Sequence, residues 1–404
     1  MKFFHISDLH IGKRVCGFSM LEDQRYILNQ IADLAREYRP DGIWVAGDLY
    51  DKSMPSAEAV ELADSFLYQF AEMEIPVWVI SGNHDSAQRI AYGGRMMEQA
   101  GIHMARIFDG TMQKYTINGK EKADIWLLPF VRPAQVQRFY PDCTIETTQQ
   151  AVKAILQHTQ LDGNRRNILL MHQFLAGASV CESEEISIGG SDQIDASAVS
   201  GFDYVALGHL HGPQKVVKDT VRYCGSPLKY SFSEVHHRKS VTVLELSDSE
   251  YAEAQRMLSD SEKTGRETVS YEDVGIRIST IPLVPLHDMR EIRGPIDQLL
   301  SPEVYSAADQ NDYLHVTLTD KREVLDAIGR LRDVYPNIMR LDFETGQSTE
   351  GIQEEEILLE EKSPQELFAE FFVRQNGFGM DAEQYQLVEE VWNTCGKTEG
   401  GNSL

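Results

Sequence analysis

Phe3-Phe4-His5-Ile6-Ser7-Asp8-Leu9-His10 is a short, largely apolar run that ends in an Asp-x-His pair. Four more apolar runs in the first 211 residues end in the same kind of polar cluster. These clusters are Gly47-Asp48 after 42–46, Gly82-Asn83-His84-Asp85 after 77–80, His172 after 168–171, and Gly208-His209-Leu210-His211 after 204–207. Apolar runs of this length are typical of strands that are buried on both faces.

Amphipathic helical patterns lie between these runs. Residues 20–37 have one apolar face, and Ser19 with Glu22 is expected to form a capping box at the start of that helix. A second helix is predicted at 57–73. Strands that alternate with helices predict a layered α/β domain. Ligands of such sheets bind beyond the carboxyl ends of the strands, so we expect the five polar clusters to converge on one site.

Seven side chains in these clusters are suitable metal ligands: Asp8, His10, Asp48, Asn83, His172, His209 and His211. Their oxygen and imidazole donors suffice for two divalent cations. Residues two apart in a strand point the same way, so each Asp-x-His or His-x-His pair is predicted to reach one metal cluster. Taken singly, each cluster also fits ordinary turn chemistry, and a lone histidine also fits a core position.

The composition places limits on domain number and on partners. The 404 residues are enough for two or three domains. The formal net charge is -25, of which the first 240 residues carry only -5. Simple polyelectrolyte binding to nucleic acid is therefore disfavoured, and an anionic substrate is expected to bind the first segment.

Neither secretion nor membrane insertion is indicated. The five cysteines are dispersed and odd in number, which argues against a disulfide framework and against a thiolate zinc site. No stretch approaches the roughly 18 apolar residues that cross a bilayer, and no secretory signal is recognisable. We therefore expect a cytoplasmic protein.

The sequence changes character after residue 246 and predicts three further parts. Residues 247–275 are expected to form a charged insertion or linker, 276–346 a small α+β domain, and 347–404 an acidic linker with C-terminal helices. In the small domain we predict strands at 276–281, 313–319 and 338–343 and a helix near 322–333.

The tail contains two amphipathic patterns with aromatic or large apolar faces. Ser363-Pro364-Gln365-Glu366 is a strong helix start. The two faces consist of Leu367, Phe368, Phe371 and Phe372, and of Leu387, Val388, Val391 and Trp392. Helices this short must pack on the body of the protein or on a partner, and the residues alone favour packing on the body.

The ordered motifs resemble the signature of the calcineurin-like metallophosphoesterases. That signature runs Asp-x-His, Gly-Asp-x-x-Asp, Gly-Asn-His-Asp/Glu, His and Gly-His-x-His, and every element occurs here in order. The flanking stretches 5–13, 47–56 and 225–232 are similar to those of the bacterial SbcD nucleases. The resemblance implies a nuclease domain at 1–246, built as a layered β-sandwich flanked by helices. It also implies a small α+β capping domain and a C-terminal helical pair.

The resemblance further implies roles for the clustered residues. Asp8, His10 and His211 would hold one ion and Asn83, His172 and His209 the other, with Asp48 bridging both. Manganese is the usual ion of the family, although the residues themselves are compatible with iron, zinc or magnesium. His84 would contact the scissile phosphate and stabilise or protonate the leaving oxygen. Asp51 and Asp85 would orient ligands without binding metal.

As a family member the chain would be an exonuclease on double-strand ends and an endonuclease on single strands and hairpins. It would act in DNA repair, recombination and replication with an SbcC-type ATPase that carries long coiled coils. The tail helices would dock on the base of those coils. A homodimer through the helices that follow Arg25 and Ala57, and hence a heterotetramer with the ATPase, is also implied.

Two alternatives are open at this point. The five metal motifs are shared by hydrolases that act on phosphoproteins or cyclic nucleotides, although the flanking stretches and the extra domains disfavour that substrate. A DNA-end scaffold with an inactive site is the other alternative, and the complete set of seven ligands with His84 argues against it.

Overall fold

The computed structural model describes residues 1–119, 122–181, 184, 193–247, 275–320 and 324–344, together with Phe368, Ala369, Phe372, Met380, 384–386 and Val388 in the tail. The chain forms two compact units, Met1–Thr345 and Gly346–Leu404. The predicted insertion at 247–275 falls almost wholly outside the described residues.

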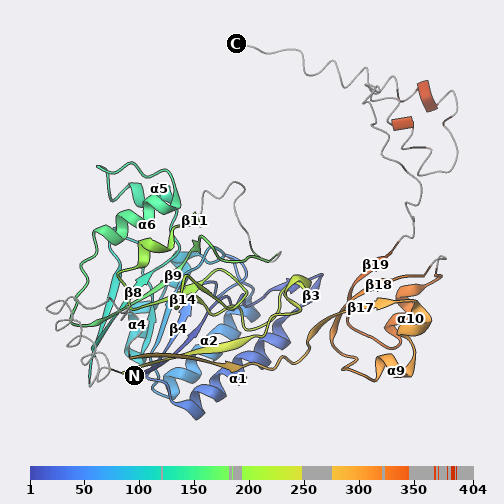
Figure 1. Cartoon of the computed structure of the whole chain (residues 1–404), viewed down its shortest axis with the longest axis horizontal. Helices are drawn as coiled ribbons and strands as arrows, with labels where there is room; N and C mark the ends of the chain where they lie inside the picture. Colours follow the sequence, from blue (N-terminus) through green and yellow to red (C-terminus); the bar gives the residue numbers. More distant parts are fainter. Residues whose placement is uncertain are drawn as a thin grey trace, which may run out of the picture. The chain divides into compact units, whose positions relative to one another are not determined.

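Two six-stranded sheets form the centre of the first unit (Figure 1). The first has the order β16 (Ile276–Pro282), β15 (Ser240–Leu246), β1 (Lys2–Ile6), β4 (Gly42–Ala46), β5 (Val77–Ile80) and β6 (Ile102–Met104). The second has the order β13 (Gln214–Val216), β14 (Lys218–Tyr223), β12 (Tyr204–Gly208), β9 (Arg166–His172), β8 (Lys122–Leu128) and β7 (Gln113–Asn118). The five strands predicted from apolar runs, β1, β4, β5, β9 and β12, are buried along almost their whole length.

The two sheets pack face to face around an apolar layer. Phe3 stacks on Trp44 at 4.5 Å between ring centroids, and both pack in one cluster with Ile125 and Ile168 of the second sheet. A polar contact also joins the sheets directly, because His5 Nδ1 lies 3.0 Å from the Tyr204 hydroxyl. The layer fixes the two sheets relative to each other, as in other β-sandwiches.

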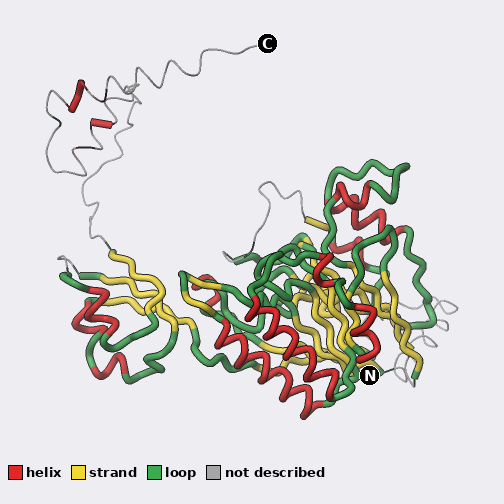
Figure 2. The backbone as a smooth tube through the Cα atoms, turned by 180° about the vertical axis from the view of Figure 1, so that it is seen from behind, coloured by secondary structure: helices red, strands yellow, loops and turns green. Residues whose placement is uncertain are grey.

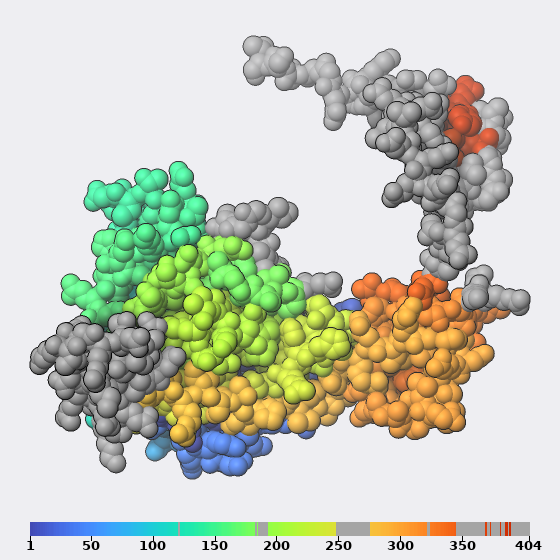
Figure 3. All heavy atoms as spheres, viewed as in Figure 1, coloured from blue at the N-terminus to red at the C-terminus, as the bar shows by residue number. Residues whose placement is uncertain are grey.

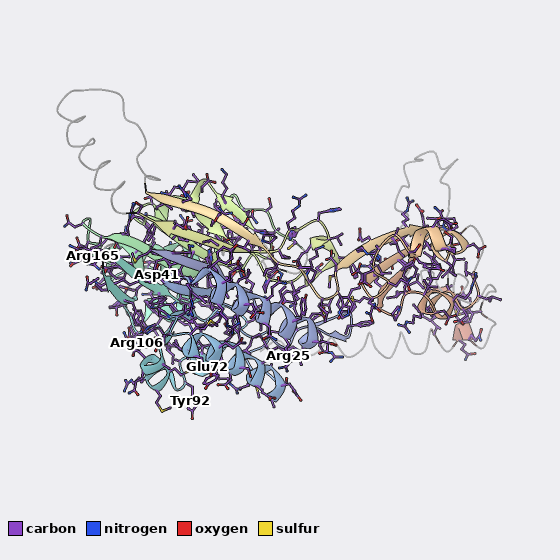
Figure 4. The ribbon with its side chains drawn as sticks, turned by 90° about the horizontal axis from the view of Figure 1, so that it is seen from below. Arg25, Asp41, Glu72, Tyr92, Arg106 and Arg165 are labelled. Carbon is purple, nitrogen blue, oxygen red and sulfur yellow. The ribbon has the colours of Figure 1, made fainter. Side chains whose placement is uncertain are left out.

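Helices cover the outer faces of the sandwich (Figure 2). α1 (Leu21–Tyr38) and α2 (Ala57–Glu72) run side by side on the first sheet, as Figure 4 shows. The second sheet is covered by α6 (Thr148–Gln157), with the short helices α5 (Pro133–Gln137) and η2 (Ala196–Val199) nearby. Short helices α3 (Ala87–Ile90), α4 (Gly94–Met97) and η1 (Glu98–Ala100) follow β5, and η3 (Phe232–Glu234) precedes β15. The predicted layered α/β sandwich is therefore confirmed.

The predicted capping box at Ser19 is wrong. Met20 is the N-cap residue of α1, and it makes no side-chain capping hydrogen bond. The reason is that Ser19 belongs to β3 (Phe18–Ser19), which pairs with β2 (Arg14–Val15) in a small hairpin. α2, by contrast, begins with a side-chain cap, in which Ser56 Oγ accepts from the Ala59 amide.

The strand at 276–282 does not belong to the small sheet, contrary to the prediction. β16 pairs antiparallel with β15 along its whole length, from Ser240 opposite Pro282 to Leu246 opposite Ile276. Its alternating burial fits an edge strand with one exposed face. The sequence pattern could show that a strand forms here but not which sheet it joins.

The small sheet contains three parallel strands, β17 (Met289–Gly294), β18 (Tyr313–Leu318) and β19 (Ile338–Phe343). Its helices are α8 (Ile296–Leu299), α9 (Pro302–Tyr305) and α10 (Ala327–Arg332). The last two predicted strands and the predicted helix are therefore present, with the helix shorter than expected. In Figure 3 this part is orange and meets the yellow-green surface around residue 230.

Asp23 of α1 connects the sandwich to the small domain. Its buried carboxylate accepts from the Tyr313 hydroxyl at 2.6 Å and lies 3.0 Å from His287 Nδ1. Lys229 adds an ion pair with Asp288 at 2.8 Å. A buried carboxylate with several donors is costly to leave unpaired, so these contacts favour a defined docking of the small domain.

In the second unit, the described tail positions Phe368, Ala369, Phe372, 384–386 and Val388 are helical, in agreement with the predicted pattern. Leu367, Phe371, Leu387, Val391 and Trp392 lie outside the described residues. A search of the described part of the chain finds no helix with the length and apolar character needed to span a membrane.

Candidate metal centre

The predicted ligands follow strands whose carboxyl ends meet at one edge of the sandwich. β1, β4 and β5 are parallel neighbours in the first sheet, and β9 and β12 are parallel neighbours in the second. Beyond their ends, the amides of Asp8 and His10 donate to the carbonyls of Gly47 and Asp48 at 3.1 and 2.9 Å. The His209 amide, from the second sheet, donates to the Asp8 carboxylate at 3.0 Å. Main-chain hydrogen bonds thus join the loops after β1 and β4, and the Asp8 carboxylate joins them to the loop after β12 of the second sheet.

Asp8, His10 and His211 form one buried group, whose ligand atoms lie within 4.8 Å of one another. Nε2 of His10 is 3.1 Å from Nε2 of His211. His211 Nδ1 is 3.1 Å from a Glu234 carboxylate oxygen, so the ring proton lies on Nδ1 and Nε2 carries a lone pair. Two imidazole nitrogens that face each other in this way point at a common position, as ligands of one cation do.

Asn83, His172 and His209 form a second group. Asn83 Oδ1 lies 3.0 Å from both His172 Nε2 and His209 Nδ1. His172 Nδ1 donates to the Ala46 carbonyl at 2.8 Å, which directs Nε2 into the site. Burial, with a contribution from His172, lowers the pKa of His209 to about 3, so that imidazole is neutral and able to act as a ligand.

Asp48 lies between the two groups, where the bridging ligand is predicted. Its Oδ2 is 3.1 Å from His172 Nε2 and 3.7 Å from His10 Nε2. Burial opposes ionisation of Asp48, but the neighbouring imidazoles outweigh it and lower its pKa. Burial likewise lowers the pKa of His172, but the carboxylates of Asp48 and Asp8 outweigh it and raise that pKa to about 9. Asp48 is therefore an ionised carboxylate, with one ligand group on each side of it.

The donor set fits divalent cations. Burial raises the pKa of Asp8 and raises the pKa of Asp85 to about 6, with Asp48 adding to both shifts, so the site concentrates carboxylates that need positive charge beside them. Burial also raises the pKa of the nearby Cys224 thiol, which contacts Ser7 Oγ at 3.0 Å and so remains protonated. Oxygen and imidazole ligands without a thiolate are compatible with manganese, iron, zinc or magnesium.

His84 lies beside the first group, and one of its ring nitrogens is within 4.8 Å of ligand atoms of His10 and Asp48. Its Nδ1 lies 2.9 Å from the Asp51 carbonyl, to which it donates, and its ring centroid is 4.8 Å from that of His10. With its proton on Nδ1, a neutral His84 presents Nε2 as an acceptor, and a protonated His84 presents it as a donor. The half-buried ring is thus suited to exchange a proton with a group at the mouth of the site.

Asp85 and Asp51 lie beside the ligand groups, and their role in orienting ligands stays a prediction. The Asp85 carboxylate accepts from the amides of Leu49, Tyr50 and Gly82 at 2.9 to 3.1 Å, and so ties the loop after β4 to the loop after β5. The Asp51 carboxylate pairs with Lys13 at 2.8 Å and lies 3.8 Å from His10 Nδ1.

Sequence reasoning did not identify Glu234 and Lys239, which support His211. Glu234 is completely buried, and its carboxylate binds His211 Nδ1 and the Lys239 ammonium, the latter at 2.5 Å. Lys239 Nζ also donates to the His211 carbonyl at 2.9 Å. Burial opposes ionisation of Glu234, but Lys239 outweighs it and lowers the pKa of the carboxyl. A Glu and a Lys five residues apart before a strand carry no recognisable motif, so only the fold reveals this pair.

The backbone at the ligands corrects one part of the sequence reasoning. Asp8 and His10 lie beyond the end of β1, and His209 and His211 lie beyond the end of β12, so alternation along a strand does not bring either pair together. Asp8, His10 and Asp48 have φ of 52°, 43° and 49°, and His209 has φ of 105°. Non-glycine residues rarely adopt these values, and such strain is concentrated at functional sites.

Two glycines allow the close approach of these loops. A Cβ on Gly208 would lie 1.9 Å from the Ala46 carbonyl oxygen, and a Cβ on Gly82 would lie 2.1 Å from Asp48 Oδ1. Both distances are far below van der Waals contact, and the first involves main chain that cannot move aside. Gly208 therefore allows the loops of the two sheets to approach each other, and Gly82 does the same for the loops after β4 and β5 of the first sheet.

Sequence comparisons assign the chain to a family. Residues 1–213 match the model of the calcineurin-like phosphoesterases, and residues 285–376 match the SbcD C-terminal model, described as the type 5 capsule protein repressor C-terminal domain. The chain is 33% identical over 345 residues to the SbcD subunit of the SbcCD nuclease from Staphylococcus epidermidis, covering 84% of this chain and 85% of that protein. It is 30% identical over 395 residues to the same subunit of the nuclease from Staphylococcus saprophyticus, covering 97% of each.

Two solved structures are similar to part of the chain. TT1561 of Thermus thermophilus has a TM-score of 0.33 at 13% identity, covering 59% of this chain and 92% of that one. A dimetal phosphatase from Danio rerio has a TM-score of 0.35 at 11% identity, covering 60% of this chain and 92% of that one. Since these scores are low, the assignment depends on the sequence matches, which extend over both the sandwich and the small domain. The chain belongs to the SbcD nuclease family and contains a calcineurin-like phosphoesterase domain.

Proposed function

We propose that the chain is a manganese-dependent DNA nuclease subunit that acts in the cytoplasm with an SbcC-type ATPase. The substrates are double-strand ends, single strands and hairpins that arise in DNA repair, recombination and replication. The observation that carries the proposal is the convergence of two ligand groups, one buried and one half-buried at Asn83 and His209, on the Asp48 carboxylate. Its Oδ2 is 3.1 Å from His172 Nε2 and 3.7 Å from His10 Nε2. Two relatives that match most of the chain are named as nuclease subunits of SbcCD.

In this proposal the two groups hold one cation each. Asp8, His10 and His211 bind the first, Asn83, His172 and His209 bind the second, and Asp48 binds both. Two such cations would neutralise a phosphodiester and lower the pKa of water toward neutrality. Asp48 suits the shared position because its two oxygens can serve two cations at once.

His84 acts on the leaving group. Its Nδ1 hydrogen bond to the Asp51 carbonyl, at 2.9 Å, holds the ring so that Nε2 faces outward from that bond. In the protonated form Nε2 donates to a phosphate oxygen and transfers its proton to the departing sugar oxygen. Asp85 and Asp51 keep the loops after β4 and β5 in register and do not contact the substrate.

The function is tested with the purified full-length chain, alone and with its ATPase, in the presence of Mn²⁺. Labelled linear and hairpin DNA are the substrates, and a small chromogenic phosphodiester reports the hydrolytic site separately. We expect DNA cleavage by the complex. Hydrolysis of the small diester without any DNA cleavage would instead indicate a phosphoprotein or cyclic-nucleotide hydrolase, and no hydrolysis of either would indicate a scaffold.

Glu234 is predicted to set the metal affinity through His211. We expect Glu234→Gln to weaken Mn²⁺ binding by about 10- to 100-fold, the range typical of residues that orient a metal-bound histidine. Calorimetric titration of the metal-free protein with Mn²⁺ measures this directly. Glu245, a half-buried glutamate of β15 that pairs with Lys2 at 3.5 Å, provides the matched control Glu245→Gln, which should bind normally.

A single Glu234 substitution also leaves Lys239 buried without its partner, which destabilises proteins by several kcal/mol. The double variant Glu234→Gln/Lys239→Met removes that charge. If the double variant is folded and still binds Mn²⁺ as tightly as the wild type, Glu234 has no role in orienting His211.

The homodimer is proposed to form through α1 and α2. Val60 and Tyr68 are eight residues apart on α2, and so on one helical face, with 45% and 60% of their surface exposed. Tyr26 on the adjacent α1 is 41% exposed, and Gln69 Nε2 contacts Asn29 Oδ1 between the helices at 3.3 Å. These exposed side chains support a self-complementary surface of the kind that twofold dimers use.

The tail is proposed to dock on the ATPase through the apolar faces that contain Phe368 and Phe372. Deletion of 363–404 is expected to abolish stable binding of the ATPase, measured by size-exclusion chromatography, because an amphipathic helix contributes its apolar face to such a groove. Hydrolysis of the small diester should continue, since every ligand lies before residue 212. If ATPase binding persists while the melting temperature falls, the tail packs on the body of the chain.

A further inference from the structure

The segment 234–239 displays three side chains next to the metal centre. Glu234 and Lys239 at its two ends are buried, paired with each other, and bonded to His211 through its side chain and its carbonyl. His236 and Arg238 between them are exposed, and His237 is half-buried. The anchors therefore hold the intervening backbone close to a predicted ligand.

A cavity of about 390 Å³ lies against this segment. Its wall includes Gly212, which directly follows His211, so the cavity adjoins the metal centre. Gly212 makes the approach possible, because a Cβ there would be 3.1 Å from Cε1 of His237. Gln214 also lines the cavity, and its side chain both accepts from the Ser179 amide and donates to the Ser179 carbonyl, at 2.8 and 2.7 Å.

The charge of this cavity is opposite to that of the chain. Acidic residues outnumber basic ones by 63 to 38 over the whole sequence, yet no carboxylate appears among the described residues that line the cavity. The lining contains the Arg238 guanidinium and the imidazoles of His236 and His237. Within the described part of the chain, neither Arg238 nor His236 has a hydrogen bond or an ion pair. The two glutamates nearby are already engaged, Glu234 with Lys239 and Glu184 with the amides of Cys181 and His211.

We propose that this cavity binds a backbone phosphate of the DNA strand, next to the phosphate that is cleaved. Arg238 supplies the charge and His236 an N–H donor, and the geometry of arginine is well suited to phosphate oxygens. The next phosphate of a continuous strand must lie beside the scissile one. The cavity suits that phosphate because it adjoins the site proposed to bind the scissile phosphate. The inference rests on the proposed nuclease function. It adds to the metal centre a subsite that binds a second phosphate of the same DNA strand.

The test is the KM of the full-length chain, with its ATPase and Mn²⁺, for a single-stranded oligonucleotide between 50 and 200 mM salt. Arg238→Gln is expected to raise KM by roughly fivefold or more. It should also reduce the slope of log KM against log salt by about 0.7, the contribution of one phosphate contact on a single strand. Arg238→Lys keeps the charge and should retain most of the slope.

Arg36→Gln is the matched control, because Arg36 is an exposed arginine in the last turn of α1 and, within the described residues, pairs with Asp33 alone. It should leave both KM and the salt slope at the wild-type values. An Arg238→Gln enzyme with the wild-type KM and slope would overturn the subsite. If instead the wild type hydrolyses the small diester but no oligonucleotide, the nuclease function itself fails, and the two failures are thereby distinguished.

Discussion

Asp48→Asn is expected to lower DNA cleavage by about 10³-fold or more. The substitution preserves shape but removes the charge that both ligand groups face, at 3.1 Å from His172 Nε2 and 3.7 Å from His10 Nε2. Metal ions contribute several kcal/mol of charge stabilisation to phosphoryl transfer, and each 1.4 kcal/mol corresponds to a factor of ten in rate. The kcat on linear DNA in saturating Mn²⁺ measures the effect.

A second readout separates metal binding from chemistry. Mn²⁺ should raise the melting temperature of the wild type, because a ligand of the native state stabilises it by mass action. In Asp48→Asn that rise should be much smaller. Asp41 gives a matched control at the other end of the same strand, where it is exposed and accepts from the Lys2 amide at 2.6 Å (labelled in Figure 4). Asp41→Asn should behave as the wild type. If Asp48→Asn cleaves DNA as fast as this control, the Asp48 carboxylate does not hold the metal ions.

The sequence indicates which side chains gather at this edge of the sandwich because two kinds of information coincide there. Side-chain chemistry marks Asp8, His172 and the other ligands as donors, and the buried apolar runs before them mark strand ends. Both kinds of information can be obtained without the tertiary fold. Parallel strands present their carboxyl ends at the same edge, so the side chains that follow them are expected to lie together. All seven predicted ligands, with His84 beside them, are accordingly found at one edge of the sandwich.

The features that the sequence did not predict depend on contacts between distant segments. The left-handed backbone of Asp8, His10, Asp48 and His209 is imposed by loops of two sheets that bond to each other, and local propensity gives no sign of it. Likewise β16 joins the first sheet because the edge of β15 is free to pair with it. The alternating pattern of β16 predicts a strand but does not indicate its pairing partner.

The distribution of charge along the chain, rather than its total, bears on the binding of an anionic substrate. The total of -25 argues against nucleic acid, but four fifths of the excess lies beyond residue 240. Two divalent cations at the site would bring about +4 to a segment that carries -5. The cavity beside Arg238 adds local positive potential, and local potential rather than total charge governs the binding of an anionic strand.

His84→Gln is expected to reduce kcat on DNA by about 10²- to 10⁴-fold, the usual contribution of a general acid, while leaving Mn²⁺ affinity nearly unchanged. His84 is not one of the seven residues assigned to the two cations. A ring nitrogen of His84 lies within 4.8 Å of ligand atoms of His10 and Asp48, and the bond of Nδ1 to the Asp51 carbonyl at 2.9 Å holds the ring beside them. Glutamine can keep a donor near that carbonyl but cannot supply a proton at neutral pH. A calorimetric Mn²⁺ titration alongside the kcat measurement tests both halves of the prediction.

His158 at the end of α6 provides the control for His84, because it is an exposed histidine whose Nδ1 also bonds a main-chain carbonyl, that of Ala154, at 2.7 Å. His158→Gln should keep the wild-type kcat. A substrate whose leaving group needs no proton provides a second test. The rate of hydrolysis of a nitrophenyl phosphodiester should fall much less in His84→Gln than the rate of DNA cleavage. Equal losses on the two substrates would show that His84 positions the phosphate and does not protonate the leaving oxygen, and a large loss of Mn²⁺ affinity would make it a ligand instead.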